Sequence, residues 1–316
     1  MKNYKQILKL FLFSLIGGFI LFFLLKNIKI DDIKEIVNRL NIFYLVIGFL
    51  LYTIVYLMRA KRFYFLLKNK ISFKKIFIIT CIHNFFNMIL PARTGEISYS
   101  IMLKKDSIRM TDSLSHVVIA RIYDLFGLFF LFFISLFFFL SSDLKIFSLL
   151  GLLLIIVIFF IFNTFLKKIV NFLNKIESKN NFIIKVKLFL SNLLNNINIL
   201  NKNEKIWLII NSLLINFLMF LFGYVIMIGM SFNISIWACF VGGFLAFLTT
   251  ILPIQGFFNI GTMELGWVFG YVAAGLSLTD ATTSGVMYHL INIFFTLSLS
   301  LFGFLLYFLK IKNEKL

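Results

Sequence analysis

The stretch FSLLGLLLIIVIFFIFNTFL, residues 147–166, decides the fold class of this sequence, because its 20 residues include no charged side chain. A transmembrane helix needs about 20 mostly apolar residues to cross the hydrocarbon core of a bilayer. Segments of the same character recur along the chain, at residues 10–25, 42–58, 125–140, 206–230 and 286–309. The sequence therefore predicts a protein that crosses a membrane several times.

The composition supports the same conclusion, since 61% of the 316 residues are hydrophobic and only 14% are charged. That is more apolar material than one soluble core of this length can bury. Only helices and closed barrels span a bilayer, and barrel strands would give short alternating segments instead of unbroken apolar runs. We predict an all-α polytopic membrane protein that forms one integral membrane domain over residues 1–316.

The formal net charge of +18 indicates a membrane topology and not a nucleic-acid partner. The basic residues lie in loops between apolar segments, which is the pattern of the positive-inside rule. Cys81 and Cys239 lie inside apolar segments without CxxC spacing, so neither a disulfide nor a zinc site is expected.

The loop charges predict which loops face the cytoplasm. The N-terminus, a basic loop at residues 59–75 and a central basic loop at residues 167–205 are predicted to be cytoplasmic, and the mixed loop 26–39 external. Residues 10–25 lack a small-residue cleavage site, so we expect them to remain as the first helix. Residues 182–200 are predicted to form an amphipathic helix on the membrane surface.

Counting crossings between these loops predicts two re-entrant hairpins. The apolar stretch 76–90 must return to the side from which it entered, with a turn at Pro91, because a third crossing would place the central loop outside. The same count applied after residue 206 predicts a second hairpin formed by residues 236–252 and 262–276. Its turn follows Pro253 and contains Gly256 and Gly261.

The two predicted turns share a tripeptide and the residues that follow it. Ile-Leu-Pro occurs at 89–91 and again at 251–253, an offset of 162 residues, and each copy is followed by a glycine and a glutamate. These are Gly95 and Glu96 in the first half and Gly261 and Glu264 in the second. We predict an inverted repeat of three transmembrane helices and one re-entrant helical hairpin per half, with halves at about 1–143 and 144–316. Such repeats are typical of transporters whose site lies at the repeat interface.

Charged side chains inside the apolar segments are candidates for function, because burying a charge in lipid is costly. The predicted substrate-binding residues are Arg93, Glu96, Arg121, Asp124 and Glu264. Arg121 and Asp124 are three residues apart on one helical face, so they can pair with each other, either as a structural pair or as part of a substrate site.

Other polar residues favour hydrogen bonding between helices. His83, Asn84 and Asn87 form a patch on the first hairpin, and His289 stands alone in the last span, without the second ligand cluster of a metal site. The sequence has no GxxxxGK[ST], GxSxG or HExxH motif. We therefore expect no cofactor, no metal and no catalytic residues.

Three short motifs resemble those of a known family. LPARTGE at 90–96, RIYD at 121–124 and LPIQG with GTME at 252–264 look like the signatures of the lysylphosphatidylglycerol synthase transmembrane-region family, also described as flippase-like membrane proteins. The chain departs from the family at Ala120, where an acidic residue is often found, and at Phe258 and Asn259, where small residues are usual.

The resemblance extends over almost the whole chain and implies a function. In bifunctional relatives this membrane part is taken to flip an aminoacylated phospholipid made by a separate cytoplasmic transferase domain. No such domain follows the last span of this sequence, so the resemblance implies the flippase half without the synthase activity.

The predicted function is a flippase-like transporter, and not an enzyme, for a phospholipid or a lipid-linked anionic substrate. Its expected partners are membrane lipids, anionic ones in particular, in the cytoplasmic membrane, with both termini cytoplasmic. Two alternatives remain open. One is a membrane enzyme acting on a lipid headgroup or polyprenyl phosphate, with Glu96 or Glu264 as acid or base. The other is a noncatalytic partner of an envelope-glycan or lipid-synthesis enzyme.

Overall fold

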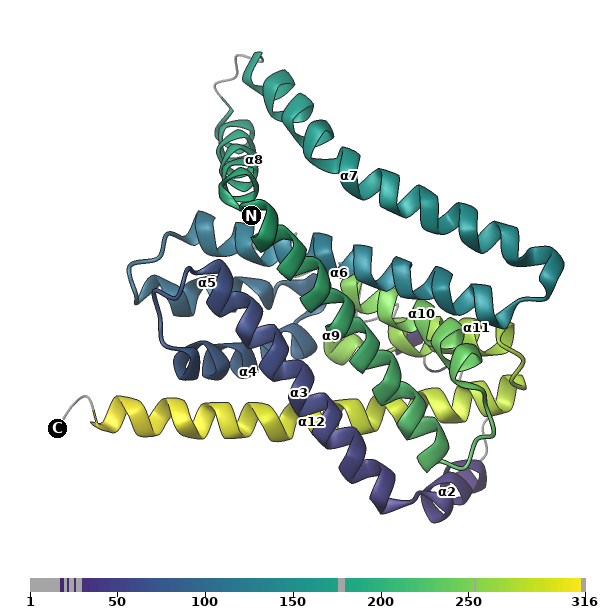
Figure 1. The fold of residues 1–316 in the computed structure, drawn as a ribbon. Helices are drawn as coiled ribbons and strands as arrows, with labels where there is room; N and C mark the ends of the chain where they lie inside the picture. Colours follow the sequence, from purple (N-terminus) through teal and green to yellow (C-terminus); the bar gives the residue numbers. More distant parts are fainter. Residues whose placement is uncertain are drawn as a thin grey trace.

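A computed structural model describes residues 30–175, 180–252 and 254–313, together with residues 18, 19, 22 and 26. These residues form helices and no strands, which confirms the all-α prediction (Figure 1). The helices are α2 (Ile30–Arg39), α3 (Ile42–Leu66), α4 (Phe73–Ile89), α5 (Glu96–Lys104), α6 (Met110–Phe139), α7 (Lys145–Lys175), α8 (Asn181–Ile199), α9 (Lys202–Gly229), α10 (Ile236–Ile251), α11 (Thr262–Ala273) and α12 (Leu278–Asn313). Short 3₁₀ turns lie at η1 (Pro91–Arg93), η2 (Ser142–Leu144) and η3 (Phe257–Asn259).

Five helical stretches of the described chain are long and apolar enough to cross a membrane. They are Ile42–Leu66, Met110–Phe139, Ser142–Phe162, Lys202–Gly229 and Leu278–Leu309, and each contains or overlaps a predicted span. The predicted first span at 10–25 lies almost wholly outside the described residues. The protein is therefore a membrane protein with several spanning helices.

The surface of α7 shows why lipid is the required solvent. Leu153, Phe160 and Phe165 are 60%, 74% and 58% exposed, with further large apolar side chains along the same helix. Apolar surface in water is unfavourable by roughly 25 cal/mol per Å². Figure 1 shows α7 along the outer edge of the molecule, where this surface can face hydrocarbon.

Both predicted hairpins contain a break at the predicted place. The helix α4 ends at Ile89, just before Pro91, and α10 ends at Ile251, while Pro253 itself lies outside the described residues. The arms have 17 and 9 residues in the first hairpin and 16 and 12 in the second. No single arm reaches the roughly 20 residues of a spanning helix. Whether the hairpins are re-entrant in the membrane stays a prediction.

The two halves of the chain contain the same order of elements and pack against each other. The order α3, α4, η1, α5, α6 is repeated as α9, α10, η3, α11, α12. Across the halves, α3 packs on α9, α4 on α12, and α6 on α10. Because helices of one half pack on helices of the other, the turns η1 and η3 come into contact. The opposite orientation of the halves in the membrane, and their boundary near residue 143, stay predictions.

The structure corrects the predicted loop at residues 59–75. Helix α3 continues to Leu66, so Arg59, Lys61 and Arg62 are helical, and Arg62 is only 2% exposed. Long straight-chain residues such as arginine are good helix formers, and Arg62 has an acidic partner inside the protein. The predicted amphipathic stretch 182–200 forms α8, which packs on α6 and α7 through Leu193 and Ile197.

Candidate functional site

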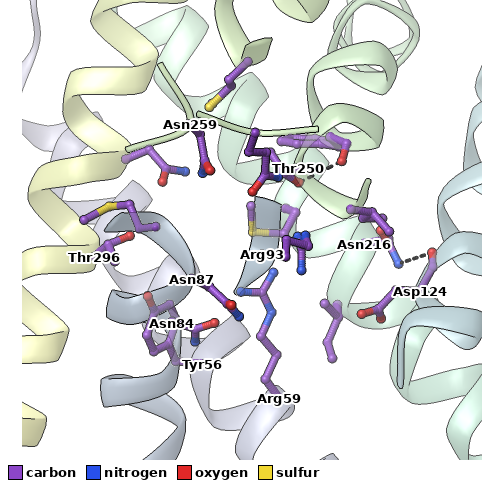
Figure 2. Close-up of a pocket in the computed structure, with 18 of the residues that line it drawn as sticks. Tyr56, Arg59, Asn84, Asn87, Arg93, Asp124, Asn216, Thr250, Asn259 and Thr296 are labelled. Atoms are coloured by element: carbon purple, nitrogen blue, oxygen red, sulfur yellow. Dashed lines mark hydrogen bonds between the residues drawn. The ribbon is translucent and has the colours of Figure 1, made fainter. Parts of the chain in front are cut away.

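A cavity of about 110 Å³ lies where the two halves meet. Its walls come from α3, α4, α6, α9, α10, α11 and α12 and from both hairpin turns. Figure 2 shows Arg59 reaching toward Arg93, with Asn84 and Asn87 on one side and Asp124 with Asn216 on the other. The cavity therefore has a largely polar lining in a protein whose outer surface is apolar.

The first turn has a strained backbone that depends on a close approach of its arms. Ala92 and Arg93 have φ of 51° and 54°, in the left-handed region that residues other than glycine seldom adopt. At Gly95, a Cβ atom would lie 2.3 Å from the backbone of Phe86 and 2.4 Å from that of Asn87. Only glycine lets α5 begin so close to α4, which explains the predicted importance of Gly95.

The second turn repeats this strain. Phe258 and Asn259 have φ of 54° and 60°, and Gly261 has φ of 83°. Gly256, in contrast, has φ of −78°, which any residue can adopt. The positive φ at position 261 therefore favours glycine. Phe258 and Asn259, shortly before it, adopt left-handed conformations although they have side chains.

Glu264 and His289 hold this second turn together. The backbone N–H of Gly261 donates to Glu264 Oε2 at 2.8 Å, and Glu264 Oε1 lies 2.6 Å from His289 Nδ1. His289 Nε2 lies 2.9 Å from the carbonyl oxygen of Phe258, so Nε2 must be the donor because a carbonyl only accepts. A hydrogen bond between Nδ1 and Oε1 then needs one proton, carried by either group. His289 is thus a satisfied interior histidine, as predicted.

The two turns are joined directly. The backbone N–H of Ala92 donates to the carbonyl of Gln255 at 2.8 Å, and Gln255, 2% exposed, donates from Nε2 to the carbonyl of Thr249 at 2.9 Å. The strained segment of one half is therefore hydrogen-bonded to the turn of the other half.

Four arginines and two carboxylates form a network beside the cavity. Glu96 Oε1 accepts from Arg93 Nη1 at 2.8 Å and from Arg121 Nε at 3.0 Å. Asp124 accepts from Arg62 through both oxygens, at 2.5 and 3.0 Å. No ion pair joins the fourth arginine, Arg59, to a carboxylate of the described chain. The network thus has two more positive than negative charges.

The predicted pair of Arg121 and Asp124 is present but is the weaker contact of each residue. Arg121 Nη1 lies 3.6 Å from Asp124 Oδ2, farther than the contacts that Asp124 makes with Arg62. Arg62 also donates to Ser212 Oγ at 2.8 Å, so it connects α3, α6 and α9. Its planar guanidinium matches the carboxylate of Asp124 with two parallel hydrogen bonds.

The family model described as lysylphosphatidylglycerol synthase TM region matches residues 6–300. The chain belongs to this family. It is accordingly a membrane protein of a family related to lipid metabolism or transport. No curated protein and no solved structure matches the chain significantly.

In this lysylphosphatidylglycerol synthase TM region, the three motifs quoted above converge on the cavity. Arg93, Arg121 and Asp124 line it. Glu96 is not among the lining residues, and its carboxylate accepts hydrogen bonds from both Arg93 and Arg121. Glu264, 3% exposed, does not line the cavity and instead fixes the turn that carries Asn259. The residues of the two turns that line the cavity include Arg93 and Asn259, and not the glutamates Glu96 and Glu264 that were predicted to face a shared site. Whether the predicted residues bind a substrate stays a prediction.

Sequence reasoning missed Arg59 and Arg62. Both were assigned to a basic cytoplasmic loop, although their spacing of three residues at the end of an apolar helix was a signal for one shared face. The patch of His83, Asn84 and Asn87 was predicted to hydrogen-bond between helices, but His83 and Asn87 bond to each other within α4, with Asn87 Nδ2 3.0 Å from His83 Nε2. Within the described chain, no group of three or more His, Cys, Asp or Glu side chains could hold a metal ion.

Proposed function

We propose that this protein moves a phospholipid or a lipid-linked anionic substrate across the membrane, with the phosphate bound in the cavity between the two turns. The observation that carries the proposal is the surplus of arginine there. Arg59, Arg93 and Arg121 line the cavity, while the carboxylates nearby are already bound by Arg62, Arg93 and Arg121. Arginine is the side chain best suited to phosphate, because its fork of N–H groups matches the phosphate oxygens.

The position of the cavity supports transport in particular. Irregular backbone at membrane depth is tolerated only where it is buried in protein or lines a cavity, and both broken helices meet at this one. Transporters with internal repeats place their site at such a junction of broken helices. A site made by both halves can change its access when one half moves against the other.

The lining favours binding over acid–base chemistry. Asp124 is the carboxylate among the described lining residues, and Arg62 occupies both of its oxygens. A general base needs a free oxygen within reach of the proton that it removes. The proposal therefore treats the charged residues as a binding site for an anion.

Reconstituted protein in liposomes tests the proposal. Wild-type protein should speed the exchange of fluorescent phosphatidylglycerol between leaflets, measured by quenching of the outer leaflet with dithionite. Arg59→Gln should slow the exchange about tenfold or more, because a charge-assisted hydrogen bond contributes about 1.5–3 kcal/mol. Lys61→Gln removes an exposed positive charge from the same helix and should leave the rate unchanged.

Two outcomes would contradict the proposal. One is a wild-type rate equal to that of protein-free liposomes for every anionic lipid tested. The other is the disappearance of a lipid species from whole-membrane extracts of cells that express Glu96→Gln or Glu264→Gln, which would assign an enzyme that makes or modifies that lipid.

A further inference from the structure

Five buried polar atoms on residues that line the cavity have no hydrogen-bond partner within the described part of the chain. Three are donors, namely Arg59 Nε, Arg93 Nε and Asn84 Nδ2, and two are acceptors, namely Asn87 Oδ1 and Asn259 Oδ1. Native proteins satisfy most buried polar atoms, so a group of unsatisfied ones around a single cavity requires an explanation.

Two of these atoms belong to residues of the strained turns, Arg93 in one turn and Asn259 in the other. Arg93 and Asn259 are each the second of two consecutive residues with positive φ, one in each turn. Strain of this kind persists where the surrounding structure imposes it, and it is found most often at ligand sites. Figure 2 shows Asn259 in the upper part of the view and Arg93 near its centre, with Asn84 and Asn87 beside Arg59.

The mixture of free donors and acceptors limits the chemistry of the ligand. A phosphate diester only accepts hydrogen bonds, so it can satisfy Arg59 and Arg93 but not Asn87 Oδ1 or Asn259 Oδ1. A hydroxyl group both donates and accepts, so it can satisfy the asparagine oxygens and Asn84 Nδ2. A phosphate that carries hydroxyl groups therefore matches the whole set.

An ammonium group matches poorly, although it too can donate to the asparagine oxygens. Glu96 Oε1 is shared by two arginines, and Arg62 binds both oxygens of Asp124. An added cation would lie among Arg59, Arg93 and Arg121, and none of the described cavity-lining carboxylates is free to neutralise it. Like charges repel strongly in a site with little water.

We propose that the cavity recognises a phospholipid headgroup whose phosphodiester carries a neutral, hydroxyl-bearing group, and that it discriminates against an aminoacylated headgroup. This inference rests on the proposed function for its choice of a lipid ligand. The family is described by lysylphosphatidylglycerol, a lipid whose lysyl ester carries ammonium groups. The proposal therefore gives this chain a different ligand. The arginines bind the phosphate, and Asn84, Asn87 and Asn259 bind the hydroxyl groups.

Binding to the purified full-length protein in detergent tests the headgroup separately from transport. The probes are dihexanoyl forms of phosphatidylglycerol, phosphatidylethanol and lysylphosphatidylglycerol, with glycerol 3-phosphate as a probe without acyl chains. Intrinsic tryptophan fluorescence or thermal stabilisation gives the affinities. We expect phosphatidylglycerol to bind about tenfold more tightly than phosphatidylethanol, a phosphodiester without hydroxyl groups, because its hydroxyl groups add hydrogen bonds. The lysyl lipid should bind more weakly than phosphatidylglycerol by a larger factor. A glycerol 3-phosphate affinity equal to that of the lipids would assign a site for soluble phosphates.

Single asparagine variants identify the hydroxyl contacts. Asn87→Ala and Asn259→Ala should each reduce the preference for phosphatidylglycerol over phosphatidylethanol by about threefold, so that together they account for the tenfold preference, while the exposed Asn233→Ala should leave it unchanged. Arg59→Gln should weaken both lipids. Equal or tighter binding of the lysyl lipid, or an unchanged preference in both asparagine variants, would overturn the headgroup assignment.

The two proposals fail in different experiments. If phosphatidylglycerol binds with the expected preference but liposomes show no translocation, the transport proposal is wrong and the headgroup assignment stands. If lipid is translocated and the headgroup makes no difference to binding, the headgroup assignment is wrong and transport stands.

Discussion

The ion pair between Arg62 and Asp124 should contribute more to stability than the neighbouring contact between Arg121 and Asp124. Arg62 is 2% exposed and binds both oxygens of Asp124, at 2.5 and 3.0 Å. Removing one partner of a buried ion pair leaves the other charge unpaired and costs about 3–5 kcal/mol. Arg121 makes one contact with Asp124, at 3.6 Å, and its side chain is 22% exposed, so we expect a coupling of about 1 kcal/mol or less.

Two double-mutant cycles measure the difference. The variants are Arg62→Met, Arg121→Met and Asp124→Asn, alone and in the pairs 62/124 and 121/124. Unfolding in mixed micelles with increasing sodium dodecyl sulfate, followed by circular dichroism, gives the free energy of unfolding of each variant. We expect a coupling of about 3 kcal/mol for the pair with Arg62, because the double variant leaves no buried charge unpaired.

Arg59→Met is the matched control, because Arg59 lies one helical turn from Arg62 and has no ion pair with a described carboxylate. Its replacement should change the free energy of unfolding by less than about 1 kcal/mol, within the range of substitutions that break no buried contact. Equal couplings in the two cycles, or a larger one for Arg121, would refute the assignment of Arg62 as the main partner of Asp124.

Three further predictions concern the turns and the topology. Gly95→Ala should prevent accumulation of folded protein, since its Cβ would lie 2.3 Å from backbone atoms of Phe86, whereas Gly223→Ala, with its nearest neighbours at 3.9 Å, should be tolerated; gel-filtration yield compares them. Glu264→Ala should lower the free energy of unfolding by about 2–3 kcal/mol by leaving Gly261 N–H and His289 Nδ1 without partners, and Glu264→Gln, which can still accept and donate, should lose less. Cysteines placed at the exposed positions 68 and 185 should react with an impermeant maleimide only after the cytoplasmic side is opened, and a cysteine at 280 should react from outside; the native Cys81 and Cys239 are buried and give little background.

Helix positions and turns could be predicted because local sequence determines them. Long apolar segments predict the spans. The break after α4 is predicted by Pro91, which has no backbone N–H with which to continue a helix, and by Gly95, where a Cβ atom would collide with the backbone of Phe86. The polar patch on α4 was predicted less well, because His83 and Asn87, four residues apart, bond to each other and not to another helix.

The partners of the charged residues could not be predicted in the same way. Arg62 and Asp124 are 62 residues apart, and Arg121 is 25 residues from Glu96, so only the packing of α3, α5 and α6 brings them together. A basic run at the end of an apolar segment has the same pattern whether it faces water or an internal acid. The positive-inside rule explained the whole run at 59–75 equally well, and so it concealed the two arginines that face inward.

The cavity depends on both halves of the chain, because each turn contributes a strained residue to its lining. Ala92, Arg93, Phe258 and Asn259 all have positive φ, and each such residue costs about 1–3 kcal/mol. The contacts that offset this cost are the bond from Ala92 to Gln255, the ion pairs of Arg93 and Arg121 with Glu96, and the contacts of Glu264 with Gly261 and His289. The first of these joins the halves directly, and it would be lost if they moved apart. Arg93 and Asn259 are strained and line the cavity, so in the proposed transport cycle a movement of the halves that relaxes the turns should withdraw both side chains from the bound anion. Under the proposed function, the geometry that would bind the anion between the halves would therefore also provide a way to release it.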